Sequence, residues 1–423
     1  MICPASRRLN IEPVVSQHAE EAAFLWLQRS RLAHAPHVAL RHFARIDERV
    51  AAHVDGLRVA GEFGWELLQA QLATGGAGEL FAAAVMALEG KDAERIDRLF
   101  ALAEAVPTVQ RGLRGAFGWI SAPFLQGTIK ELLASPSPFR RYAAIACCAM
   151  HRVDPGKSLD ASLRDADSLL RSRPLRSAAE LGRVDLLPEC ERAMQDDDAA
   201  CRFWAAWGGA LLGDRRNAVD SLLAFARELG MFHGRALRLA LKVMTVEDAH
   251  AFLESLAPNP KNLRWLIQGS GIVGDPYYVP WLIKQMGDMK LTRLAGESFS
   301  YITGLDLARL DLEAKPPENF EPGPNDDPDD PDVSMDPDDS LPWPDSEKIA
   351  NWWDSNKSGF TSGVRYFMGK PVTREHCIQV LKEGYQRQRI AAAEYLCLLE
   401  PGAKLFPTSA PAWRQQRWLS KMN

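Results

Sequence analysis

The sequence predicts an all-α protein built as a solenoid of stacked helix pairs. The first observation behind this prediction is a turn that recurs about every 30 residues, a period typical of repeat proteins. The second is that each interval between turns contains two amphipathic stretches with apolar residues at helical spacing. Because a single helix pair cannot cover its own apolar face, neighbouring pairs must stack. The turns stand near Ser121, Val153, Gly182, Gly213, Thr245, Gly274 and Gly304.

The interval around Gly213 shows the pattern in detail. Apolar residues recur at three- and four-residue steps in Cys201–Leu212 and again in Val219–Phe225, and Gly213 separates the two runs. The same plan is repeated around Gly274, where Pro276 suits the first turn of the second helix. Proline fits there because the missing N–H leaves no helical hydrogen bond unmade.

Composition along the chain divides it into four segments. They are a helical N-terminal segment (1–60), the helix-pair array (61–312), an acidic Pro/Asp-rich loop (313–348) and a small helical C-terminal region packed on the array (349–423). We expect helices from Val14 to Gln28, from Pro36 to Val54 and from about Glu375 to Leu399, and no sheet beyond isolated bridges.

Four tryptophans of the C-terminal region form either a satellite core or an exposed docking patch. The core is favoured because aromatic side chains bury the most area. The four are Trp352, Trp353, Trp413 and Trp418.

The acidic loop dominates the charge distribution. Residues 311–345 contain thirteen acids and one base, Lys315, so they carry a charge of −12, whereas the rest of the chain carries +7. The density of prolines excludes a helix, and the lack of large apolar residues excludes a core. The loop therefore either lies along basic side chains of the same protein or attracts a basic partner.

The candidate partner-binding residues follow from this charge pattern and from two arginines that begin the last long apolar helix. We expect Arg387 or Arg389 to pair with an acid of the final repeats or of the loop, because a bidentate arginine–carboxylate pair would fix the C-terminal region to the array. The candidates are Asp326, Asp327, Asp329, Asp330, Asp332, Asp336, Asp338, Asp339, Arg387 and Arg389.

No motif predicts catalysis, a cofactor or a metal. The loop aspartates lack the D-x-D-x-D-G spacing of a calcium loop, so a solvated linker is favoured over a cation site, although cation binding by the loop stays open. The histidines between His34 and His53 lack ligands that would complete a zinc set. The glycine-rich stretch at 74–79 lacks the Gly-Lys-Ser/Thr ending of a nucleotide-binding loop.

The sequence also predicts a cytoplasmic protein without a membrane segment. No apolar run approaches the roughly 18 residues that span a bilayer, and acids stand where the apolar core of a signal peptide would lie. Seven cysteines, an odd number, indicate free thiols rather than a disulfide framework.

Six blocks spread over the whole chain carry a resemblance: Leu32–His37, Asp47–Leu57, Arg293–Phe299, Ile302–Asp306, Leu341–Asp345 and Gln386–Ala393. These blocks resemble an uncharacterised proteobacterial family with short HEAT-like repeats. That family has no established activity, and its genes often lie beside those of type VI secretion, including spike and PAAR-like tip proteins. The resemblance implies an accessory role in secretion and assigns no catalytic residue.

Together these observations favour a protein-binding scaffold that is not an enzyme, acting as an adaptor or loading chaperone for a type VI secretion effector or spike-tip component. An immunity protein that occludes a toxin is the alternative within the binding class. A nucleic-acid-binding repeat protein is the alternative of another class, although the pI of about 6.0 disfavours it. Its basic strip would consist of Arg140, Arg141, Arg171, Arg173, Arg176 and Arg183. The oligomeric state stays open.

Overall fold

The computed structural model describes residues 10–73, 75–318, 320, 323 and 334–422. Helices provide almost all of the regular structure in these residues, which confirms the prediction of an all-α solenoid with an acidic loop and a helical C-terminal region. None of the described helices is long and apolar enough to cross a membrane. Strands β1 (Tyr366–Phe367) and β2 (Lys370–Pro371) form an antiparallel hairpin, so the expectation of isolated bridges alone was wrong here.

The chain packs as two compact units, each described by itself below. Unit 1 consists of the residues up to Leu181 and those from Phe406 onward, and unit 2 of Gly182–Leu405. The four segments defined by composition remain a prediction. Six of the seven cysteines belong to the described residues, and all six are buried free thiols.

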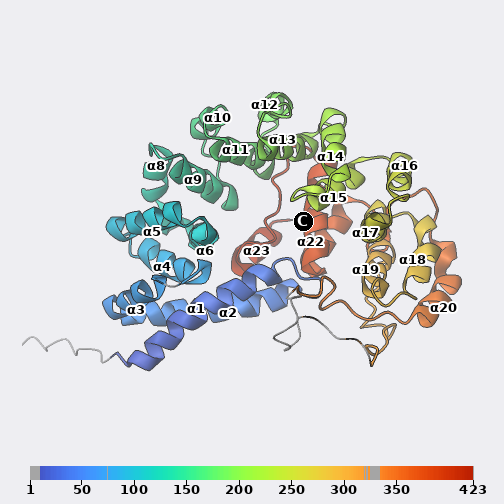
Figure 1. Ribbon diagram of the computed structural model, residues 1–423, viewed down its shortest axis with the longest axis horizontal. Coiled ribbons are helices and arrows are strands. Elements are labelled where there is room, and N and C mark those ends of the chain that lie inside the picture. The colour runs from blue at the N-terminus through green and yellow to red at the C-terminus, as the bar shows by residue number, and fades with distance from the viewer. Residues whose placement is uncertain (1–9, 74, 319, 321–322, 324–333, 423) are drawn as a thin grey trace, which may run out of the picture. The chain divides into compact units, whose positions relative to one another are not determined.

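Unit 1 begins with two long antiparallel helices and continues as stacked pairs (Figure 1). Its core contains the fully buried side chains Phe43, Phe81, Phe100 and Phe117. The short helix α23 returns from the end of the chain to pack on α2. The helices are α1 (Glu12–Leu32), α2 (Leu40–Ala60), α3 (Glu62–Leu72), α4 (Ala77–Glu89), α5 (Ala93–Ala105), α6 (Gln110–Trp119), α7 (Ala122–Leu125), α8 (Thr128–Leu133), α9 (Pro138–Met150), α10 (Lys157–Ser162), α11 (Ser168–Leu181) and α23 (Ala412–Leu419).

Unit 2 has two layers of helices. Helices α13, α15, α17 and α19 contact one another in succession and form what we call the A layer, and α12, α14, α16 and α18 pack beside them (Figure 1). The helices are α12 (Leu187–Ala193), α13 (Ala199–Leu212), α14 (Asn217–Arg227), α15 (His233–Val243), α16 (Val246–Leu256), α17 (Leu263–Val273), α18 (Val279–Gln285), α19 (Thr292–Thr303), α20 (Ser346–Asn356), α21 (Arg374–Glu383) and α22 (Gln386–Leu399). One-turn 3₁₀ helices stand at Pro107–Val109, Val184–Leu186, Pro260–Asn262, Pro276–Tyr278 and Lys357–Gly359.

The seven predicted turns all follow the end of a helix. They come after α6, α9, α11, α13, α15, α17 and α19, in the order in which the sequence predicts them. Gly213, Gly274 and Gly304 end their helices in the left-handed conformation, with φ of 116°, 75° and 73°. Glycine adopts this conformation without the steric cost that a Cβ atom imposes.

The helix expected from Glu375 to Leu399 is two helices, α21 and α22, which corrects that prediction. Gly384 takes an extended conformation (φ −71°, ψ 170°), and Tyr385 follows it with ψ of 162°. The side chain of Gln388 accepts a hydrogen bond from the backbone N–H of Tyr385 at 2.9 Å, which closes the start of α22. The apolar spacing continues across this break because both helices bury apolar residues where they pack on each other.

The four tryptophans of the C-terminal region do not share one environment. Trp353 is buried in the core of unit 2 beside α18, whereas the Trp413 side chain, on α23 of unit 1, is 37% exposed. Trp352 and Trp418 are half-buried. The expectation of a core position therefore holds for Trp353 and for Trp352, which packs against the same core, but not for Trp413.

Candidate binding surface

The described end of the acidic loop is bound by two arginines of the A layer in unit 2. The guanidinium of Arg264, in the first turn of α17, donates to both carboxylate oxygens of Asp338, at 3.0 and 2.5 Å. Arg293, in the first turn of α19, donates to Asp336 at 2.6 Å and to the backbone carbonyl of Asp338 at 3.1 Å. Because Asp338 is only 3% exposed, it serves as an internal contact.

Arg293 is also held between two aromatic rings. Its guanidinium carbon lies 4.8 Å from the ring centre of Phe320 and 4.6 Å from that of Trp343. The two rings contact each other edge to face, with 4.8 Å between centres. A guanidinium in this position gains from both ring faces while its edge binds carboxylate.

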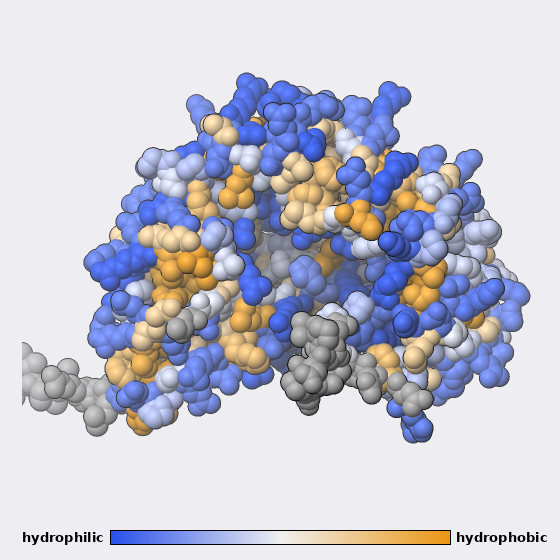
Figure 2. Space-filling model, viewed as in Figure 1, coloured by the Kyte–Doolittle hydropathy of each residue, from blue (hydrophilic) through white to orange (hydrophobic). Residues whose placement is uncertain are grey.

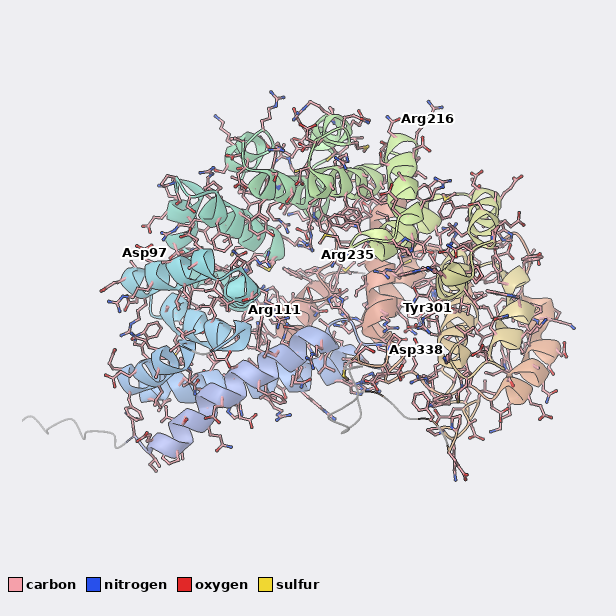
Figure 3. The ribbon with its side chains drawn as sticks, in the orientation of Figure 1. Asp97, Arg111, Arg216, Arg235, Tyr301 and Asp338 are labelled. Atoms are coloured by element: carbon pink, nitrogen blue, oxygen red, sulfur yellow. The ribbon has the colours of Figure 1, made fainter. Side chains whose placement is uncertain are left out.

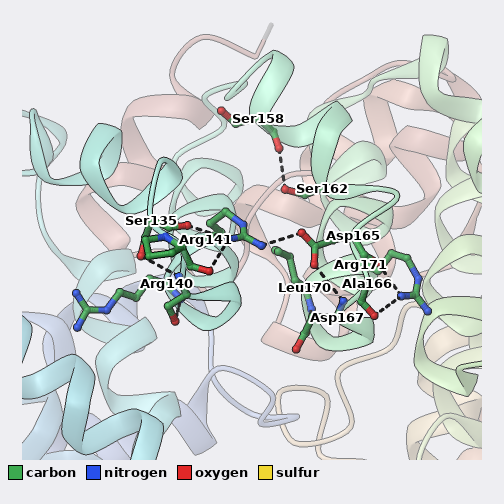
Figure 4. A network of polar contacts seen from close by, with 12 residues as sticks. Ser135, Arg140, Arg141, Ser158, Ser162, Asp165, Ala166, Asp167, Leu170 and Arg171 are labelled. Atoms are coloured by element: carbon green, nitrogen blue, oxygen red, sulfur yellow. Dashed lines mark hydrogen bonds and ion pairs between the residues drawn. The ribbon is translucent and has the colours of Figure 1, made fainter.

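The turn at Asp336–Asp338 has the geometry of a turn that recurs inside the array. The backbone N–H of Asp338 donates to the Asp336 carboxylate at 3.0 Å, and the N–H of Asp167 donates to Asp165 at the same distance. In unit 1, Asp165 accepts from Arg141 of the preceding helix pair at 2.7 Å (Figure 4). The acidic loop thus supplies aspartates to the arginines of α17 and α19. In unit 1 the equivalent aspartate, Asp165, is supplied by the next repeat.

The remaining loop candidates divide into two groups. Asp339 is exposed and accepts a hydrogen bond from the Ser340 hydroxyl at 3.1 Å. Asp326, Asp327, Asp329, Asp330 and Asp332 lie outside the described residues. Among the residues that the structure describes, no group of three or more acids, histidines or cysteines is arranged to hold a metal ion.

The two candidate arginines of the C-terminal region have different roles. Arg387 donates from Nη1 to both carboxylate oxygens of Glu297 on α19, each at 2.9 Å, which confirms the expected pairing with an acid of the final repeats. Burial raises the pKa of Glu297, and Arg387 opposes that effect. Arg389 is fully buried instead; it donates to the Leu381 carbonyl at 2.7 Å and to the side chain of Gln386. Arg389 therefore joins α21 to α22.

The C-terminal region of unit 2 docks on the periodic turns. The N–H of Tyr366 donates to the Gly274 carbonyl at 2.8 Å, and a Cβ atom at Gly274 would lie 2.1 Å from the Tyr366 oxygen. At Gly304 a Cβ would lie 2.5 Å from the Met368 oxygen. The turn glycines are thus required by the approach of a second backbone as well as by their own φ angles.

Arginines from the C-terminal part of the chain cover two turns that lack a left-handed glycine. In unit 2, Arg365 donates to the carbonyls of Lys242 and Met244, at 2.5 and 2.8 Å, at the end of α15. In unit 1, Arg414 donates to the carbonyls of Gly118 and Ile120, at 2.8 and 2.9 Å, at the end of α6. Each guanidinium satisfies helix-terminal carbonyls that would otherwise need a cap.

The strip of arginines considered for nucleic acid is occupied by contacts within the protein. Arg140 pairs with Asp97 at 2.5 Å, and Arg183 pairs with Asp185 at 2.7 Å. Arg173 and Arg176 both bind Glu180. Arg141 binds Asp165, and Arg171 donates to the carbonyls of Asp165 and Ala166 (Figure 4). These contacts join loops and helices of the array, and they offset much of the positive charge that phosphate binding requires.

A row of tryptophan and arginine on the A layer of unit 2 is the feature that sequence reasoning missed. Trp204 on α13, Arg235 on α15 and Trp265 on α17 are spaced 31 and 30 residues apart, so they occupy one position of the repeat. The Arg235 guanidinium lies 5.7 Å from the Trp204 ring centre. Trp265 packs on His233, with 4.4 Å between ring centres. We call Trp204, Arg235 and Trp265 the Trp–Arg row.

The Trp–Arg row is accessible although the C-terminal region packs on the same unit. Arg235 is exposed, as is Arg238 one turn further along α15, and both tryptophans are half-buried. Helix α22 contacts α15 near its opposite end, where Glu394 pairs with the buried Lys242 at 2.5 Å. Figure 3 labels Arg235 at the start of α15, away from Arg216 at the N-terminal end of α14.

The equivalent repeat positions in unit 1 carry residues of the same two classes. Arg114 on α6 donates to the Tyr142 hydroxyl at 2.7 Å and lies 5.5 Å from its ring centre. Arg173, 31 residues after Tyr142, is buried with Glu180. Cation and aromatic residues therefore alternate at one repeat position through both units. This alternation of cationic and aromatic residues is the sequence pattern that would have identified the Trp–Arg row.

Comparison of the chain with protein-family models, curated proteins and solved structures found no match.

Proposed function

We propose that this protein is a protein-binding scaffold and that the Trp–Arg row is part of its binding surface. The supporting observation is that Trp204, Arg235 and Trp265 are presented side by side from three packed helices, with Arg235 exposed. Tryptophan and arginine are the residues most enriched among those that dominate protein-binding energy. Helices hold these side chains in place before a partner arrives, which lowers the entropic cost of binding.

A surface of mixed character suits a partner that is recognised by specific side chains. Figure 2 shows a face on which hydrophilic residues predominate and apolar residues gather in separate patches. An extended client segment can place one or two side chains on the tryptophans while its backbone and polar groups meet the arginines. This mode of binding fits an adaptor or a loading chaperone.

The sequence resemblance suggests which partners to test. Its blocks resemble a family encoded beside type VI secretion genes, so a secretion effector or a PAAR-like spike-tip protein is the partner that we propose. The resemblance supports this choice by association alone.

The test is co-expression with the products of the neighbouring genes, followed by affinity capture and size-exclusion chromatography. We expect a stable complex with an effector or tip protein, and we expect the double variant Trp204→Ala/Trp265→Ala to lose it. Trp352→Ala is the matched control, since Trp352 is also half-buried in unit 2 and contacts Phe299 edge to face. If the protein forms no stable complex with even one of these products, the proposal is refuted. Neutralisation of a toxic product would indicate an immunity protein instead.

A further inference from the structure

We propose that a cavity in unit 1 binds an organic cation, an ammonium or guanidinium group on an apolar stem, and that Glu89 is the residue that pairs with it. The cavity has a volume of about 370 Å³ and lies where α2, α3, α4, α5 and α7 meet. This inference goes beyond the proposed function, which concerns the Trp–Arg row of unit 2. The side chains in the wall of the cavity are Arg58, Glu62, Met86, Glu89, Arg95 and Phe124.

The shape of the cavity leaves room for a ligand. Gly61 and Gly90 contribute only backbone to its wall, and a Cβ atom at Gly61 would meet nothing within 4 Å. The volume falls within the range of about 300–1,000 Å³ that is typical of ligand pockets. A stem of a few CH₂ groups therefore has space beside Met86 and Phe124.

The charges around the cavity single out Glu89. Arg58 pairs with Asp55 at 2.8 Å, and Arg95 pairs with Glu62 at 2.5 Å, so each arginine of the wall has an acid other than Glu89. In the part of the chain that the structure describes, Arg58 and Asp55 act on the Glu89 carboxylate without a hydrogen bond to it. The cavity therefore has a surplus negative charge at Glu89.

Burial and the end of a helix both disfavour this charge. Glu89 is half-buried, and burial raises the pKa of its carboxyl group, while the charge of Arg58 opposes that effect. Glu89 is also the last residue of α4, where the partial negative charge of the helix C-terminus repels a carboxylate. A cation bound beside Glu89 would relieve both effects.

The apolar part of the wall indicates an organic cation rather than a metal ion. Phe124, on α7, is 36% exposed, and Met86, on α4, is half-buried, so apolar surface lies in the same cavity as the carboxylate. Lysine and arginine side chains bury their CH₂ stems along such surface while the charged end meets a carboxylate. A calcium ion would instead need about six to eight oxygen ligands.

The first experiment measures binding of small probes to the full-length protein by saturation-transfer NMR. The probe is n-hexylammonium, its neutral control is n-hexanol, and Ca²⁺ tests for a metal site. We expect hexylammonium to bind at least about tenfold more tightly than hexanol. Binding should also tighten about two- to fourfold for each CH₂ group added between butylammonium and hexylammonium.

A labelled peptide separates the two sources of this chemistry, a side chain of a partner protein and a free amine. The peptide has one lysine flanked by glycine and serine, and its matched control has acetyl-lysine instead. Fluorescence polarisation that rises with the lysine peptide alone would assign the cavity to a partner's side chain. Binding of hexylammonium without binding of either peptide would assign it to a free amine.

Protein variants locate the binding. Glu89→Gln should weaken hexylammonium binding at least about tenfold, whereas Glu66→Gln, at an exposed acid on α3 of the same unit, should leave it within about twofold. Because the carboxylate is disfavoured where it stands, Glu89→Gln should melt at the same temperature as the unchanged protein or higher. Glu89→Lys should bind hexanoate more tightly than hexylammonium, a gain that requires a folded protein.

Four results would overturn the inference. They are equal binding of hexylammonium and hexanol, tighter binding of Ca²⁺ than of hexylammonium, equal losses in the Glu89 and Glu66 variants, and a lower melting temperature of Glu89→Gln. The last result would show that the carboxylate stabilises the fold of unit 1 instead of serving a ligand.

Discussion

Gly274→Ala is the substitution that most directly tests how the C-terminal region docks on unit 2. Gly274 has φ of 75°, and its carbonyl accepts from the Tyr366 N–H at 2.8 Å. A Cβ atom there would lie 2.1 Å from the Tyr366 backbone oxygen, a contact that no side-chain rotation can relieve. The β1–β2 hairpin must therefore move away from the turn.

Gly363 provides the matched control for this substitution. It has φ of 81° and belongs to the same unit, but a Cβ atom there meets nothing within 4 Å. Gly363→Ala should cost only the strain of the left-handed conformation, about 1–2 kcal/mol. Gly274→Ala should cost that strain, about 1 kcal/mol for the hydrogen bond, and about 1–2 kcal/mol for partial exposure of the buried Tyr366.

The expected difference between the two variants is therefore about 2–3 kcal/mol in the free energy of unfolding. Urea unfolding followed by circular dichroism and tryptophan fluorescence measures it. Limited proteolysis should also show faster cleavage around the hairpin in Gly274→Ala alone. Equal destabilisation of the two variants would show that the hairpin does not depend on its contact with the turn.

Three further predictions concern unit 1. Arg414→Met should lower the free energy of unfolding by about 2–4 kcal/mol relative to Arg417→Met, an exposed arginine on the same helix, because carbonyls at the end of α6 lose their donor; similar urea midpoints would contradict this. Burial raises the pKa of Glu180, but Arg173 and its neighbours outweigh burial and bring the pKa from 4.5 to about 2. Its stabilising effect is thus present above pH 4.5 and lost as the pH falls toward 2, and Glu180→Gln should flatten the pH dependence of the unfolding free energy in that window. Burial, followed by the charge of Arg414, lowers the pKa of His151 from 6.5 to about 4, so stability should fall as the pH drops from 6.5 to 4; an unchanged melting profile in His151→Gln would refute this.

The helix-pair array could be predicted from the sequence because the patterns that specify its helices and turns are local. A glycine such as Gly274 interrupts a run of apolar residues, and the interruption recurs at a regular interval. The two N-terminal helices were predicted for the same reason, as their periodicity is continuous. Periodicity alone failed at Gly384, where two helices of similar pattern meet at a turn.

The candidate surface was less predictable because it depends on which distant segments meet. The charge of Asp336 and Asp338 was visible, yet their burial against Arg293 and Arg264 follows from the path of the chain back to the array. In the sequence, Arg389 and Arg387 look alike, since both lie at the start of a helix. Arg389 is buried because α21 packs on α22 and encloses its side chain. The Trp–Arg row was not predicted from the sequence because aromatic and cationic residues alternate at its repeat position, so no single residue type recurs there.

The return of the last residues to early helices has a consequence for how the protein is made. In unit 1 the Arg29 side chain donates to the Ser409 carbonyl, 380 residues later, and Asp47 accepts from the Ala412 N–H, 365 residues later. At typical synthesis rates of about 5–20 residues per second, these partners leave the ribosome roughly 20–80 s apart. During that interval the Asp47 carboxylate lacks its Ala412 N–H donor, and the face of α2 on which α23 packs stays uncovered. A message that ends before Phe406 would yield a unit 1 that lacks α23.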